Sequence, residues 1–261
     1  PAHISVPMVS VIMATYNCAK YIEFAIRSIQ LQTLTNWELI VVNDRSTDNT
    51  DSLLRTMAYQ DDRIIYLHNQ HNLGCYASKN IGIQYARGQW LTFQDADDYS
   101  MSERLEKQLT LCISGQAAPR ETHSDNTKYD CCYVTSLSRK EKVWSWVPIT
   151  MFIRAHTFRN ILGSFDVVRF GADSEIRERM DVLGIHVGVF DDYLYACPDR
   201  WIELASRQQS LTGNNQHNPI RRKYKKAFTT FHNKMRQLPL EIRKQCLKYT
   251  FGSSVNRPFE I

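Results

Sequence analysis

The sequence is poor in the residues that mark fibrous, disordered or cross-linked chains. It has 10 glycines and 8 prolines among 261 residues, too few for a collagen-like or low-complexity protein. Its 7 cysteines are an odd number and form no CxxC pair, which argues against a disulfide scaffold and against a structural zinc site. We expect reduced thiols that pack as small hydrophobic side chains.

Long apolar runs are missing as well. No window holds the roughly 20 consecutive apolar residues that a membrane-spanning helix needs, and no basic stretch followed by an apolar one opens the chain. We therefore expect a cytoplasmic protein that, with 43% hydrophobic residues, buries a sizeable core. The start at Pro1 rather than Met leaves room for additional domains of a longer chain.

The charge is divided unevenly along the chain. The whole sequence has 32 Lys+Arg and 27 Asp+Glu, a formal net charge of +5. Residues 221–261 contain 11 of these basic residues and two of the acids, so this tail has a net charge of +9 and residues 1–220 one of −4. An acidic body is followed by a basic tail, and any attraction to acidic surfaces belongs to the tail.

Apolar runs and helical periods alternate through the first hundred residues. Buried strands are predicted over 9–14, 37–42, 63–67 and 90–93, and the segments between them place apolar residues at helical spacing. Four such units in succession predict an α/β fold with a mostly parallel sheet covered by helices on both faces.

The pattern changes after Cys112. A polar, irregular stretch over 114–128 precedes predicted strands over 130–138 and 186–195 and an amphipathic helix over 173–183. From 219 onward the basic segment has apolar residues at helical spacing. We expect one domain over 1–218, made of a nucleotide-binding half (8–112) and an acceptor and catalytic half (129–218), and a basic helical extension over 219–261.

Polar residues follow three of the predicted strands. In parallel sheets ligands bind at the carboxyl ends of the strands, so the first functional candidates are Thr15-Tyr16-Asn17, Asn43-Asp44-Arg45 and the acidic run Asp95 to Asp98. No GxGxxG motif and no P-loop follows the first strand, which argues against a dinucleotide-binding domain and against a P-loop NTPase.

Three carboxylates crowd the end of the fourth strand. Asp95, Asp97 and Asp98 fall within four residues, and carboxylates this close repel one another unless a cation compensates them. Hard oxygen ligands on a loop suit Mg²⁺ or Mn²⁺ shared with substrate phosphates. The alternative is a solvated acidic turn that caps the helix beginning near Ser102.

Four motifs carry a family resemblance. They are Val9 to Asn17 (VSVIMATYN), Val42 to Asp48 (VNDRSTD), Gly74 to Gly82 (GCYASKNIG) and Phe93 to Asp98 (FQDADD). In order and spacing these motifs resemble the family 2 glycosyltransferases of the GT-A fold. The similarity covers about residues 8–212 and continues through Met151 to Arg154, Ile161 to Asp166, Phe170 to Asp173 and the arginines of Ile176 to Arg179.

The resemblance implies a nucleobase pocket at the first two strands. Thr15 and Tyr16 would line it, Tyr16 by stacking, and Asp44 would accept a hydrogen bond from the base, as a carboxylate can from an imide N–H. An ordinary turn tyrosine and a turn-forming aspartate are the alternatives for Tyr16 and Asp44.

The resemblance also implies a diphosphate and metal site. Lys79 would lie near the donor phosphates, unless it is a solvated helix lysine. Asp95 would contact the donor, Asp97 would lie near the ribose and the metal, and Asp98 would bind Mn²⁺ or Mg²⁺ directly.

Asp173 is the predicted catalytic base. Glycosyl transfer with inversion needs a carboxylate on the face opposite the leaving nucleotide to take the proton of the acceptor hydroxyl. Relatives usually carry Glu-Asp at this place, where this chain has Ala172-Asp173; the alternative is a helix cap. Glu175, Arg177 and Arg179 follow on the same helix; we interpret them as a charged solvent face, with orientation of the base or the acceptor as the alternative.

Three further residues are candidates outside the main motifs. Arg207 lies in a stretch that resembles a family segment near the diphosphate and would neutralise phosphate charge. Trp144 and Trp146, two apart in an extended segment, would present their rings to one side and stack on an acceptor sugar, with core packing as the alternative.

We therefore predict a metal-dependent, inverting glycosyltransferase. It would move a sugar from a nucleotide-diphosphate donor, a UDP-sugar, to a hydroxyl of a glycan or glycolipid acceptor in surface polysaccharide synthesis. The alternative is a catalytically silent module that binds nucleotide-sugars, or nucleic acid through the basic tail; against nucleic acid, the clustered aspartates would repel phosphate. For the tail we expect peripheral contact with the inner face of the cell membrane, packing on the enzyme body, or docking to a further domain.

Overall fold

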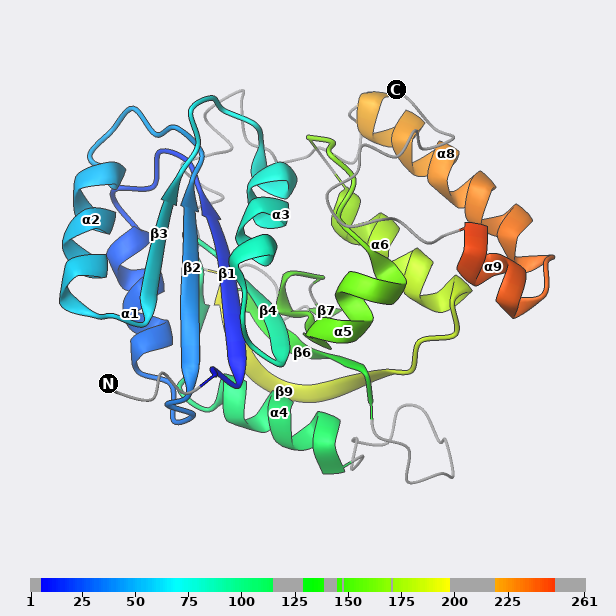
Figure 1. The fold of residues 1–261 in the computed structure, drawn as a ribbon, viewed down its shortest axis with the longest axis horizontal. Coiled ribbons are helices and arrows are strands. Elements are labelled where there is room, and N and C mark those ends of the chain that lie inside the picture. The colour runs from blue at the N-terminus through cyan, green and yellow to red at the C-terminus, as the bar shows by residue number, and fades with distance from the viewer. Residues whose placement is uncertain are drawn as a thin grey trace.

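The computed structural model describes residues 6–114, 129–138, 145–146, 148–169, 171–197 and 219–246. Within this part a nine-stranded sheet is flanked by helices on both faces (Figure 1). Its strand order is β3-β2-β1-β4-β8-β6-β9-β5, and β7 pairs with β6. The strands are β1 (Val9–Thr15), β2 (Trp37–Asn43), β3 (Ile64–His68), β4 (Trp90–Asp95), β5 (Tyr99–Ser100), β6 (Cys131–Ser138), β7 (Ser145–Trp146), β8 (Phe152–Arg154) and β9 (Val187–Cys197).

The helices follow the alternation that the sequence predicts. In the first half one helix comes after each of the first three strands, and a fourth follows β5. The α-helices are α1 (Ile22–Gln30), α2 (Thr50–Gln60), α3 (Cys75–Tyr85), α4 (Arg104–Ser114), α5 (Ala155–Thr157), α6 (Ala172–Val182), α8 (Pro219–Arg236) and α9 (Leu240–Cys246), with a 3-10 turn η1 (Pro148–Thr150) and a π-helical turn η2 (Phe158–Leu162).

The sheet has a parallel half and a mixed half. Strands β3, β2, β1 and β4 run parallel to one another. Beyond β4 the sheet becomes mixed, because β8 runs antiparallel to both β4 and β6 while β9 runs parallel to β6. The predicted α/β fold is confirmed, and the parallel half brings the carboxyl ends of β1, β2 and β4 to one edge of the sheet.

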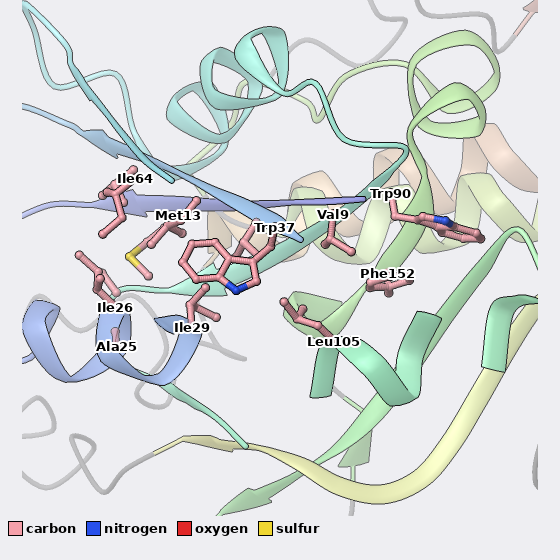
Figure 2. Close-up of a cluster of buried hydrophobic side chains, with 14 of the residues drawn as sticks. Val9, Met13, Ala25, Ile26, Ile29, Trp37, Ile64, Trp90, Leu105 and Phe152 are labelled. Atoms are coloured by element: carbon pink, nitrogen blue, oxygen red, sulfur yellow. The ribbon is translucent and has the colours of Figure 1, made fainter. Parts of the chain in front are cut away.

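The central strands are buried on both faces, which explains their unbroken apolar runs. Along β1, side chains alternate between two cores: Val9, Val11 and Met13 face one cluster and Ile12 faces the other. Figure 2 shows the first cluster, where Ile26 of α1 comes from a helix packed on this face of the sheet.

The second core joins the other face of the sheet to the C-terminal helices. Helix α3 packs on β1 and β2, and α6 and α8 lie beyond it (Figure 1). The aromatic side chains Tyr224 and Phe228 of α8 are buried, and Phe231 packs against the second core. For the basic tail we expected contact with a membrane, packing on the enzyme body or docking to a further domain. The buried aromatic side chains of α8 show that this side of the helix packs on the body. In the described part of the chain, no helix combines the length and the apolar character needed to cross a membrane.

Candidate active site

The polar residues that the sequence singles out meet at the carboxyl edge of the parallel strands. Thr15 at the end of β1 pairs in register with Asn43 of β2, and Ala14 pairs with Asp95 of β4. The backbone N–H of Asp44 donates to the Thr15 carbonyl at 2.8 Å. The predicted nucleobase residues and the acidic run are thus neighbours across three strands.

The end of β1 contains a buried hydroxyl that the protein does not satisfy. Thr15 is only 3% exposed, and its Oγ1 has no hydrogen-bond partner among the residues that the structure describes. A buried polar group without a partner is costly, so this oxygen is suited to a ligand. The next residue, Tyr16, exposes 47% of its surface, which leaves its ring available for stacking.

Asp44 holds the loop between β3 and α3. Its Oδ1 accepts from Asn69 Nδ2 at 2.9 Å and from the Leu73 N–H at 2.8 Å, and its Oδ2 accepts from the Gly74 N–H at 2.7 Å. Gly74, the N-cap of α3, has φ +94°, a conformation that only glycine adopts easily. Asp44 is 3% exposed. It therefore fixes the start of α3, a role that its sequence pattern alone did not indicate, and its contact with a base stays a prediction.

Lys79 and Asp95 form an ion pair beside the end of β4. The Lys79 Nζ lies 3.1 Å from Asp95 Oδ1, and the lysine side chain is only 6% exposed. Burial alone would lower the pKa of Lys79, but the acidic groups around it, Asp95 first among them, together raise the pKa above its usual value. The lysine is therefore charged, and it is a buried partner of Asp95 rather than a solvated helix residue.

The acidic run Asp95 to Asp98 forms a tight turn after β4. The N–H of Asp98 donates to the Asp95 carbonyl at 3.2 Å, Asp98 is 8% exposed, and its Oδ2 accepts from the Tyr195 hydroxyl at 3.0 Å. The backbone N–H of Asp95 donates to the same hydroxyl oxygen at 3.1 Å. Tyr195 of β9 therefore anchors the turn from the second half of the chain.

The turn fits a divalent cation in its donor chemistry. Asp97 and Asp98 supply hard carboxylate oxygens, while Asp95 is engaged by Lys79. Among the described residues, no group of three or more His, Cys, Asp and Glu side chains is arranged to hold a metal ion. A cation bound here would take its remaining ligands from water or substrate phosphates, as Mg²⁺ usually does.

A buried arginine that sequence reasoning missed supports this turn. Arg104 of α4 is fully buried, and its guanidinium donates to Gln94 Oε1 at 3.1 Å and to the Phe93 carbonyl at 3.0 Å. Gln94 in turn donates to the Asp98 carbonyl at 2.8 Å. Burial lowers the pKa of Arg104 to about 10, so the side chain is still charged at neutral pH.

Asp173 lies at the start of α6. The helix begins at Ala172 with Gly171 as N-cap, so Asp173 is not the cap residue. Its Oδ1 accepts from its neighbour Ser174 N–H at 2.8 Å and from the Tyr76 hydroxyl of α3 at 3.0 Å. Burial and the charge of Asp173 raise the pKa of Tyr76 well above its usual value, so the phenol stays protonated and donates.

The interpretation of a charged solvent face behind Asp173 is right for one residue and wrong for two. Arg177 is exposed, but Glu175 and Arg179 are fully buried and paired with each other. His232 of α8 contacts the same glutamate, with Nε2 3.3 Å from Glu175 Oε1. The spacing could not reveal this burial, because His232, which covers these residues, lies more than 50 residues further along the chain.

Three predicted residues are not placed. Arg207 and Trp144 lie outside the described residues, and Trp146 lies in β7, where its backbone pairs with Thr135 but its side chain is not described. Their roles toward the donor and the acceptor stay predictions.

Comparison with known proteins finds a family match over part of the chain. Residues 10–119 match the family model described as Glycosyl transferase family 2. Over these residues the chain is similar to the family 2 glycosyltransferases. The resemblance read from the four motifs is thereby confirmed, and three of them, from Val42 onward, lie wholly inside the matched residues.

Curated relatives that match this segment include two bacterial glycosyltransferases. TuaG of Bacillus subtilis, named for teichuronic acid biosynthesis, is 36% identical over 112 residues, 43% of this chain and 44% of its own length. WfgD of Escherichia coli, a UDP-Glc:alpha-D-GlcNAc-diphosphoundecaprenol beta-1,3-glucosyltransferase, is 36% identical over 106 residues, 41% of each chain. The matches thus span less than half of either relative.

Solved structures extend the likeness of fold beyond the family 2 domain. S. aureus TarS in complex with UDP has a TM-score of 0.61 at 20% identity, covering 72% of this chain and 59% of that one. The mannosyltransferase PcManGT from Pyrobaculum calidifontis, with GDP-Man and Mn²⁺, has a TM-score of 0.55 at 21% identity, covering 73% and 56%. At this identity the likeness shows a shared fold.

Proposed function

We propose that the family 2 domain transfers a sugar, with inversion, from a UDP-sugar to a hydroxyl of a glycan or glycolipid acceptor in surface polysaccharide synthesis. One observation carries the proposal: a single turn of α3 contacts both halves of the site. Lys79 pairs with Asp95 of the acidic turn, and Tyr76, three residues earlier, donates to Asp173 of α6. The carboxylate of Asp173 therefore lies across one helical turn from the carboxylates suited to the nucleotide-sugar.

The chain's own residues have separate tasks in this reaction. Thr15 and Tyr16 hold the nucleobase, and Asp97 and Asp98 would hold Mn²⁺ or Mg²⁺, which would stabilise the negative charge on the leaving diphosphate. Asp173 takes the proton of the acceptor hydroxyl as that oxygen bonds to the anomeric carbon and the bond from this carbon to the diphosphate breaks. The products are the glycosylated acceptor, UDP and a protonated carboxyl.

The relatives support the choice of donor and acceptor. WfgD is named for a UDP-Glc donor and a diphosphoundecaprenol acceptor, and TarS has been solved with UDP and with UDP-GlcNAc. PcManGT was solved with GDP-Man and Mn²⁺, which supports a divalent cation. We infer a uridine-containing donor because WfgD is more similar to this chain in sequence, and TarS in fold, than PcManGT is.

Transfer assays on two variants test the proposal. Asp173→Asn keeps the shape of the side chain but removes the proton acceptor, so we expect turnover to fall by about 10²–10⁴-fold while UDP-sugar binding persists. Asp98→Ala should remove the Mn²⁺-dependent part of the thermal stabilisation by UDP-sugar. Asp181→Asn, an exposed carboxyl on the same helix, is the control and should match the wild type.

The same assays separate the alternatives. Wild-type turnover that survives both substitutions would overturn the assigned roles. UDP-sugar binding by the wild-type chain without transfer to any glycan or glycolipid acceptor would favour the silent binding module. Salt-sensitive RNA or DNA binding at physiological ionic strength would favour a nucleic-acid binder.

We also propose that the outer face of α8 contacts an anionic membrane surface. Because the aromatic stripe of the helix packs inward, its lysines face outward, and Lys223, Lys225 and Lys226 are all exposed. Each basic residue near an anionic leaflet contributes about 1 kcal/mol. Replacing these three lysines by glutamate should abolish co-sedimentation with phosphatidylserine vesicles. Unchanged co-sedimentation would contradict the proposed membrane contact.

A further inference from the structure

We propose that Tyr76 is a positioning residue that fixes the carboxylate of Asp173 for proton transfer. The inference rests on the proposed function, in which Asp173 is the base. Its basis is the 3.0 Å hydrogen bond from the Tyr76 hydroxyl to Asp173 Oδ1, which joins α3 of the N-terminal half to α6 of the C-terminal half. The two residues are 97 positions apart, so no local sequence pattern could predict this contact.

The phenol ring of Tyr76 is held from two further directions. It packs against the ring of Phe165 with centroids 5.6 Å apart, and the Lys79 ammonium lies 5.9 Å from its centroid. Phe165 is itself clamped, since Asn80 Nδ2 donates to its carbonyl and its N–H donates to Asn80 Oδ1, both at 2.9 Å. Because Tyr76, Lys79 and Asn80 all belong to α3, the hydroxyl has a fixed position.

The hydrogen bonds to Asp173 distinguish its two oxygens. Oδ1 accepts from both the Tyr76 hydroxyl and the Ser174 N–H. Oδ2 accepts no hydrogen bond from the residues that the structure describes. Two donors on one oxygen hinder rotation of the carboxylate, so Oδ2 is the oxygen presented to an acceptor hydroxyl. General base catalysis depends on this kind of alignment, because a base must lie within hydrogen-bond reach of the proton that it takes.

The role predicts an effect on turnover that is separate from binding and folding. Tyr76→Phe removes only the hydroxyl and keeps the ring that packs on Phe165. We expect kcat for transfer to fall about tenfold, the change expected when one hydrogen bond to a charged group is lost. The KM for UDP-sugar and the melting temperature should stay at wild-type values, because the donor side of α3 is untouched.

A matched control lies on the same helix. Tyr85 is 54% exposed near the end of α3, so Tyr85→Phe removes a hydroxyl without changing the contact with Asp173 and should keep wild-type kcat. An unchanged kcat in Tyr76→Phe would overturn the inference, and so would a fall in kcat matched by a rise in KM for UDP-sugar or by a lower melting temperature, because the hydroxyl would then have a general structural role.

The variant of Asp173 separates this inference from the function on which it rests. If Asp173→Asn abolishes transfer and Tyr76→Phe does not slow it, the positioning role is wrong and the proposed base stands. If Asp173→Asn transfers sugar at the wild-type rate, the proposed base itself is wrong, and the positioning role falls with it.

Discussion

At the scale of single residues, Arg104 links the hydrophobic interior to the acidic turn. Its guanidinium makes five hydrogen bonds, to Gln94, Ser100, Thr92, Gln108 and the Phe93 carbonyl. It also lies 5.0 Å from the centroid of the Tyr195 ring, and Tyr195 in turn binds Asp98. The turn that carries the predicted metal ligands thus depends on one buried cation below it.

Removing this cation should cost much of the protein's stability. Arg104→Met fills the volume but leaves several buried oxygens without their donor, and each unsatisfied group costs about 1–3 kcal/mol. We expect a loss of about 3 kcal/mol or more in the unfolding free energy, measured in urea. Arg55→Met, where the side chain is 61% exposed, should change it little; equal losses in the two variants would contradict the assigned support.

Some of the site could be read from the sequence at this scale and some could not. Thr15, Asp44 and the acidic run could be found because each directly follows a buried strand, and parallel strands end at one edge. The sequence could not indicate the roles of Tyr76, Arg104 and Tyr195. Each role depends on contacts with residues far away in the sequence or on burial beneath the sheet. An arginine on an amphipathic helix normally indicates a solvated face. We interpreted Arg179 in this way, and the structure shows that it is buried.

At the scale of elements, Asp61 joins two helices to a strand. It follows the last residue of α2 and accepts hydrogen bonds from Gln30 Nε2 of α1 at 3.0 Å and from Arg63 Nη2, just before β3, at 2.9 Å. The bonds from Arg63 and Gln30 outweigh burial and lower the pKa of Asp61 from 3.8 to about 2. Its folded-state pKa is thus below its unfolded value.

This depressed pKa predicts an acid dependence with a definite sign. The stabilisation is fully present above pH 3.8 and is lost as the pH falls toward 2, because the unfolded chain binds the proton first. Asp61→Asn should lower the unfolding free energy by up to about 2 kcal/mol at neutral pH and flatten its fall between pH 4 and 2. Asp62→Asn, at the exposed neighbouring residue, is the control, and an unchanged slope in Asp61→Asn would contradict the assignment.

The elements themselves were more predictable than their contacts. The four parallel strands appear within one or two residues of the predicted ranges because each is a short apolar run buried on both faces. The short strands β5, β7 and β8 have two or three residues each, and a strand this short has no period that a sequence can display.

At the scale of the whole molecule, α8 is part of the folded body. Tyr224 donates to Asp166 Oδ2 at 2.6 Å, and Phe228 lies between Tyr224 and His232 on the buried side of the helix, with ring centroids 5.0 and 6.1 Å away. A helix with this much buried aromatic surface should unfold with the rest of the chain.

Truncating one ring of α8 tests that coupling. Phe228 is 1% exposed, and Phe228→Ala should lower the unfolding free energy by about 3–5 kcal/mol while circular dichroism and tryptophan fluorescence still follow one transition. Lys226→Ala, on the exposed side of the same helix, is the control. Separate transitions for the two probes would mean that α8 folds on its own.

The paired hydrogen bonds between Asn80 and the Phe165 backbone bear on how chimeras of this chain should be built. Recombining the predicted nucleotide-binding half of one enzyme with the predicted acceptor half of another is an attractive route to new linkages, and the polar sequence that follows α4 is a natural crossover point. Helix α3 belongs by sequence to the first half, yet Tyr76 and Asn80 of this helix form hydrogen bonds with the second half. A productive exchange would therefore have to transplant Tyr76 and Asn80 together with the acceptor half, while Lys79 stays matched to Asp95 of the first half.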